Sequence, residues 1–70
     1  MPKIKGWKQI GRRKWRSKIT GEIILIKRNP KTKLWVVISK IEGRPKILTG
    51  EKKVIRALDF AVEYMRKGGV

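Results

Sequence analysis

Residues 22–41 read EIILIKRNPKTKLWVVISKI, two aliphatic runs separated by a polar break that contains a proline. The first run has four consecutive aliphatic residues and the second is rich in valine and isoleucine, a composition that favours strands over helix at this length. The break Asn29-Pro30-Lys31-Thr32 has the residue types of a short hairpin loop. We therefore predict antiparallel strands over residues 22–28 and 34–41, the first of them central in a sheet.

The pattern predicts further strands on both sides of this hairpin. Residues 13–19 alternate, with Trp15, Ser17 and Ile19 on one side and cations on the other, which is typical of a half-exposed strand. Residues 42–45 predict a turn into a short strand over residues 46–48, whose leading Pro45 suits a sheet edge. Residues 1–11 contain two glycines and a proline and are typical of a flexible basic arm.

The last third of the chain has a helical period. Thr49 can cap a helix, and the apolar residues after it recur at intervals of three and four, at Val54, Ile55, Leu58, Ala61, Val62 and Met65. Gly68 and Gly69 predict its end. Residues 12–70 are thus expected to form one α+β domain, an antiparallel sheet of three to four strands with one C-terminal helix packed on one face. The other face of the sheet would be open.

Charge is the dominant property of the composition. The chain has 20 Lys and Arg against 5 Asp and Glu, a formal net charge of +15. Residues 1–46 hold 15 of the basic and 2 of the acidic residues, whereas the remainder is close to balanced. Such a body repels itself, and binding a polyanion relieves the repulsion. We therefore predict a nucleic-acid partner that meets the open face of the sheet and its hairpin loops.

Several classes of protein are not supported by the sequence. Without His or Cys there are no disulfides and no soft-ligand zinc site, and no acid–base pair or glycine-rich phosphate loop is evident. We predict a protein that is not an enzyme, with no metal, cofactor or small-molecule substrate. No apolar window approaches the roughly 20 residues of a membrane span, and the N-terminus lacks signal-peptide features. A cytoplasmic monomer or weak dimer, nucleoid-associated in a prokaryote, is expected.

Residues 11–18 concentrate five cations around one indole, that of Trp15. Guanidinium groups can clamp phosphates or read guanine edges while the ring stacks on a base, although Trp15 also fits a core position. Trp35 has the same two interpretations. If Val36 and Ile38 meet the helix, then Trp35 and Ser39 point to the open face, and we predict that parity.

The predicted contact surface combines these positions with cations at the hairpin tips, where side chains would reach phosphates. Its members are Arg12, Arg13, Lys14, Trp15, Arg16, Lys18, Lys27, Lys31, Lys33, Trp35, Ser39, Lys40, Arg44 and Lys46.

Four segments carry a family resemblance: residues 26–28 (IKR), 33–38 (KLWVVI), 44–49 (RPKILT) and 57–61 (ALDFA). Over residues 26–66 the chain resembles the plant ethylene-response-type DNA-binding domain and the N-terminal arm-binding domain of phage-type integrases. The resemblance implies a sheet docked in the major groove, with Lys27, Ser39, Arg44 and Lys46 at matching positions. Lysine stands at several of the family's arginine positions, which implies phosphate contact more than bidentate base readout.

Two alternatives to a duplex-DNA binder remain. Residues 10–26 look like the opening strands of transcriptional-coactivator-type single-strand binders, which would use Trp15 and Trp35 as stacking platforms for single-stranded DNA or RNA. The second alternative is a basic module that docks on an acidic protein or ribosomal surface. Our first prediction remains a protein that binds duplex DNA and acts as a small transcription regulator or an architectural protein.

Overall fold

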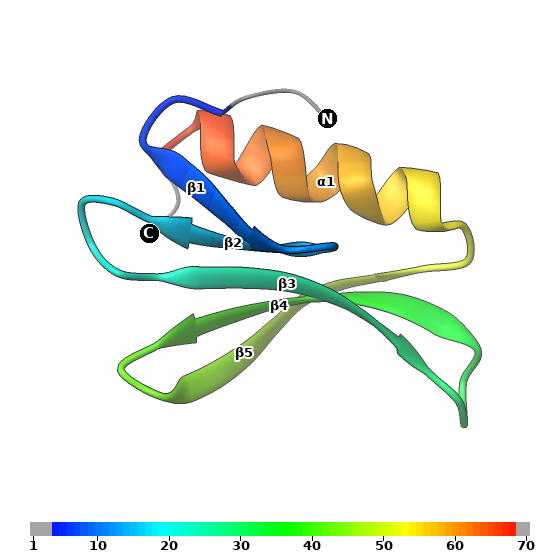
Figure 1. The fold of residues 1–70 in the computed structure, drawn as a ribbon. Helices are drawn as coiled ribbons and strands as arrows, with labels where there is room; N and C mark the ends of the chain where they lie inside the picture. Colours follow the sequence, from blue (N-terminus) through cyan, green and yellow to red (C-terminus); the bar gives the residue numbers. More distant parts are fainter. Residues whose placement is uncertain (1–3, 69–70) are drawn as a thin grey trace.

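The computed structural model describes residues 4–68 as a five-stranded antiparallel sheet with one C-terminal helix (Figure 1). The strands β1 (Trp7–Gly11), β2 (Lys14–Ser17), β3 (Ile23–Asn29), β4 (Leu34–Ile41) and β5 (Arg44–Glu51) are neighbours in chain order. Helix α1 (Val54–Arg66) lies against β3, β4 and β5. The predicted α+β class and the central place of β3 are confirmed, and the sheet has five strands instead of three to four.

The additional strand is β1, in the segment that the sequence predicted to be an arm. β1 pairs with β2, and both Ile4 and Trp7 are buried in the core. Gly6 has a φ of 83°, and its carbonyl accepts a hydrogen bond of 2.8 Å from the Lys18 amide. The glycine therefore makes a turn that an L side chain would strain, and the two apolar residues anchor the segment. Residues 1–3 of the expected arm lie outside the described residues.

The hairpin between β3 and β4 follows the sequence closely. The Asn29 carboxamide oxygen accepts a 2.9 Å hydrogen bond from the Lys31 amide, and the Asn29 carbonyl accepts one of 2.7 Å from the Lys33 amide. These bonds close the predicted polar loop. Strand β4 has the bounds that its Val- and Ile-rich run predicted, and it is paired with β3 along its length.

Strand β5 extends past the end that the sequence predicted for it. Thr49 pairs with Val37 of β4, so it belongs to the sheet and does not cap the helix. The position before α1 is Lys53, which makes no side-chain capping bond. Pairing in the ladder satisfies the backbone of residues 49–51, which outweighs the local capping preference of a threonine. The edge position of β5 is confirmed.

The core lies between α1 and the near face of the sheet. Ala57, Ala61 and Met65 of the helix are buried, and the two small alanines allow the helix to approach the strands closely. Ile55, predicted to belong to the apolar stripe, is instead 61% exposed. The polar residues between the apolar positions form the solvent side of the helix segment, since the following residues are all exposed: Lys52, Lys53, Arg56, Asp59, Glu63 and Arg66.

The predicted parity of β4 is wrong. Val37 and Ser39 are buried and Trp35 packs against the core, so these three residues face the helix. Val36 and Ile38 lie on the opposite face. Both parities of β4 carry large apolar residues, so its alternation alone does not determine which side is covered.

The core prediction is tested by a matched pair of isoleucines. Ile24 is fully buried and Ile19 is 87% exposed. Ile24→Ala leaves a cavity and should lower the free energy of unfolding by about 2–5 kcal/mol. Ile19→Ala should change it by less than about 0.5 kcal/mol. Urea denaturation measures both, and equal losses in the two variants would contradict the core described here.

Candidate nucleic-acid interface

Strand pairing determines which side chains share the sheet face that α1 does not cover, because directly opposed residues point to the same side. Three rows of paired residues cross the sheet on that side. We call them the open face: Lys8, Arg16, Ile23, Lys40 and Pro45 in the first row, Lys14, Leu25, Ile38 and Ile47 in the second, and Lys27, Val36 and Gly50 in the third.

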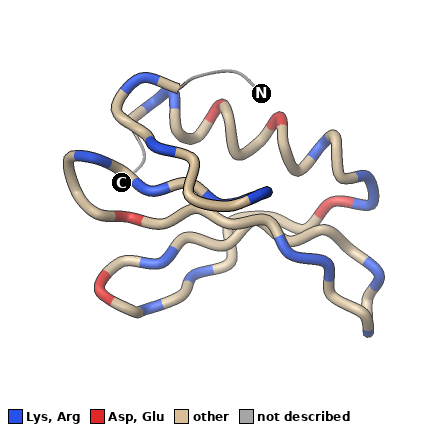
Figure 2. The backbone as a smooth tube through the Cα atoms, in the orientation of Figure 1, with Lys and Arg blue, Asp and Glu red and all other residues tan. Residues whose placement is uncertain are grey.

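The open face carries positive charge and no negative charge. Its five cations, one or two from each of the first four strands, are all exposed: Lys8, Lys14, Arg16, Lys27 and Lys40. The chain's acidic residues all lie elsewhere. Glu22 is buried, Glu42 is in the turn after β4, Glu51 is opposite Trp35, and Asp59 and Glu63 are exposed on α1. Figure 2 shows the few acidic positions of the backbone among the many basic ones. An anion that approaches this face therefore meets no carboxylate on it.

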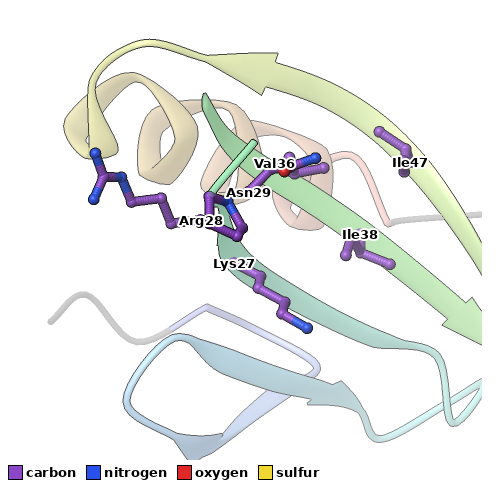
Figure 3. Close-up of a pocket in the computed structure, with 7 residues that line it drawn as sticks. Lys27, Arg28, Asn29, Val36, Ile38 and Ile47 are labelled. Atoms are coloured by element: carbon purple, nitrogen blue, oxygen red, sulfur yellow. The ribbon is translucent and has the colours of Figure 1, made fainter. Parts of the chain in front are cut away.

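Aliphatic side chains occupy the open face from its centre to the β5 edge. Ile38 and Ile47 lie side by side on β4 and β5 (Figure 3), and Ile47 is 69% exposed. They help to line an open hollow of about 280 Å³, together with Lys27, Arg28, Asn29, Pro30 and Val36. No aromatic residue belongs to the three rows. The face is therefore an apolar floor bordered by cations on strands β1 to β4.

The structure places the predicted contact residues in three groups: on the open face, in the turns at its ends, and on the helix side. Lys14, Arg16, Lys27 and Lys40 lie on the open face. Exposed positions in the turns at its ends are occupied by Arg12, Lys18, Lys31 and Lys33. Lys8 was missed, because residues 1–11 were predicted to be an arm. The alternation of Trp7 with Lys8, which matches that of Trp15 with Arg16 in the paired strand, is the signal that could have found it.

The other predicted contact residues lie on the helix side. Trp15 is only 3% exposed, so the core interpretation of this residue holds. The Arg13 guanidinium lies 5.0 Å from the centroid of the Trp35 ring, a cation–π contact that covers part of the indole. Ser39 is buried, and Lys46 is paired with it on the same side of the sheet. Arg44 lines a hollow with Lys46 and Tyr64 on that side.

A buried polar cluster also lies on the helix side. Glu22 is fully buried, and its carboxyl oxygen Oε2 accepts hydrogen bonds from the Ser39 hydroxyl and, at 2.8 Å, from the Tyr64 hydroxyl. The cluster thus ties α1 to the sheet. No group of three metal-ligating side chains occurs within residues 4–68. We assign the cluster a structural role, because burying a carboxyl group is tolerable only when it is hydrogen-bonded.

No protein-family model, curated protein or solved structure matches the chain. The likeness of residues 26–66 to the ethylene-response-type and integrase domains therefore stays a prediction from its motifs. In the described part of the chain, no helix has both the length and the apolar character to cross a bilayer.

The polar cluster predicts a pH effect near Tyr64, the chain's single tyrosine. Burial, and then the hydrogen bond and charge of Glu22, raise the pKa of Tyr64 above the ordinary 10.0. Because the pKa of Tyr64 is higher in the folded than in the unfolded protein, the tyrosine contributes stability that is fully present below pH 10.0. This contribution is lost as the pH rises through the pKa of the folded state. Above pH 10.0, the wild type should therefore lose stability relative to Tyr64→Phe.

Two measurements check this effect. The rise in absorbance that marks tyrosinate formation should occur at a higher pH in the native protein than in the urea-unfolded chain. This signal should be missing from the Tyr64→Phe variant. Urea denaturation of both proteins at several alkaline pH values gives the stability difference. Because other groups titrate in both proteins, only the difference between them reports on Tyr64. A titration midpoint for the native protein at or below that of the unfolded chain would contradict the cluster.

Proposed function

We propose that this protein binds duplex DNA through the open face and catalyses no reaction. One observation carries the proposal: five exposed cations and no acidic residue lie on the sheet face that the helix leaves uncovered. Duplex DNA presents one negative charge per roughly 1.7 Å of its axis, so an array of cations on one face can neutralise several phosphates at once. Exposed cations in the turns, such as Arg12 and Lys31, extend the array.

The position of the aromatic residues supports a duplex over a single strand. Proteins that bind single strands stack bases on exposed aromatic rings. Here the open face has none, Trp15 is in the core, and Trp35 is packed beneath Arg13. The two residues that the single-strand alternative required as platforms are thus on the covered side. A duplex needs phosphate contacts and no stacking platform.

The proposal predicts a steep dependence of affinity on salt. If the five open-face cations each neutralise a phosphate, the slope of log affinity against log salt should be about −4.5. Affinity should then fall by roughly 500-fold between about 50 and 200 mM salt. Fluorescence anisotropy of a labelled duplex, titrated at several salt concentrations, measures the slope. A flat response, or no binding to any duplex at low salt, would overturn the proposal and favour docking on an acidic protein surface.

A matched pair of double variants tests whether the open face is the surface used. Lys27→Gln with Lys40→Gln should weaken binding and reduce the salt slope by about two, because two phosphate contacts are lost. Arg56→Gln with Arg66→Gln removes the same charge from the outer side of α1 and should change the slope little. Equal effects would mean that only net charge matters and that no particular face binds.

A further inference from the structure

We propose that the open face engages DNA from the minor groove, which it opens and bends, with Ile47 as an apolar wedge at a base step. This inference rests on the proposed duplex binding and specifies how the duplex is held. Three observations support it: the width of the sheet, the apolar floor of the open face, and the exposure of Ile47 at the edge of that face.

The sheet is too wide for an undeformed groove. Five strands at about 4.8 Å spacing span roughly 19 Å. The major groove is about 12 Å wide and admits a helix or a two-stranded ribbon, and the minor groove is about 6 Å wide. A packed sheet with a helix behind it does not narrow, so the DNA has to deform if the whole open face is to touch it. Kinking toward the major groove widens the minor groove and provides such a surface.

The chemistry of the floor also favours the minor groove. The middle of the open face is Ile23, Leu25, Val36 and Ile38, which neither donate nor accept hydrogen bonds. Against the major groove these residues would bury the donors and acceptors of base edges without partners, at a cost in free energy. In an opened minor groove, an apolar side chain meets sugars and the faces of partly unstacked bases. The surrounding cations then lie toward the phosphates.

Ile47 is the open-face residue best placed to act as the wedge. It is 69% exposed, whereas its cross-strand partner Ile38 and the other branched aliphatics of the three rows are partly covered. It lies on the edge strand β5 and borders the hollow that Lys27 also lines (Figure 3). Exposure of this side chain in the free protein is unfavourable, and insertion at a base step removes it from water.

A second copy of the chain is a poorer occupant of the same face. Stacking two open faces would place five cations against five like charges with no carboxylate between them. Pairing through the β5 edge is also disfavoured, because Pro45 lacks an amide donor and the strand has an irregular register opposite Val37 and Ile38. The bordering cations select a polyanion for the apolar floor.

The first experiment measures DNA bending by energy transfer between dyes at the two ends of a short duplex. The wild type and the conservative Ile47→Leu variant should bend the duplex. At saturation, Ile47→Ala should bend it much less, and its affinity should fall by about tenfold with an unchanged salt slope. Ile55→Ala, the same substitution at a similarly exposed position on α1, should behave as the wild type. Circular dichroism confirms that each variant is folded.

The second experiment identifies the groove. Replacing guanine with inosine removes the amino group from the minor groove and leaves the major-groove edge unchanged, so binding should tighten by roughly threefold or more. Replacing guanine with 7-deazaguanine changes only the major-groove edge and should have no effect. A straight duplex, identical Ile47→Ala and Ile55→Ala behaviour, or sensitivity to 7-deazaguanine alone would overturn the wedge. These outcomes would leave duplex binding intact, whereas failure to bind any duplex would remove the proposed function itself.

Discussion

The hydrogen bonds of one buried carboxyl group determine which face of the sheet is open. Glu22 is fully buried and accepts from the hydroxyls of Ser39 on β4 and Tyr64 on α1. If Ser39 pointed to the other side, this carboxyl group would lose a buried partner, which is costly in free energy. A slip of one residue in β4 would also move every side chain of that strand to the opposite face. The position of Ser39 therefore places Trp35 and Val37 inside and Lys40 outside.

The parts of the fold that could be predicted from sequence are those with a one-sided local pattern. In β2, Trp15 and Ser17 alternate with cations, and the structure buries the first pair and exposes Lys14 and Arg16. The loop from Asn29 and the helical period after residue 53 are equally local. These signals gave the α+β class, the central hairpin and the outward position of Lys14 and Arg16, because each depends on neighbours within a few residues.

The parts that could not be predicted depend on contacts between distant residues. The parity of β4 is settled by Ser39 and Glu22, which are 17 residues apart, and both parities of the strand are apolar. Strand β1 was hidden because glycine and proline suggest an arm, whereas burial of Trp7 against the rest of the core holds it in the sheet. Thr49 has a capping side chain, yet pairing with Val37 retains it in β5. In each case tertiary contacts outweighed local preference.

The orientation of the aromatic side chains toward the helix also limits what the open face can bind. The four largest aromatic side chains of the helix side, Trp7, Trp15, Trp35 and Tyr64, build or support the core, which a chain of 70 residues without disulfides needs for stability. Their inward position leaves the open face with lysine, arginine and aliphatic residues, together with Pro45 and Gly50. Without rings it offers no stacking for a single strand, and without carboxylates it repels a copy of itself. A polyanion with apolar surface accessible between its phosphates satisfies both conditions, and a duplex opened at a base step presents that combination.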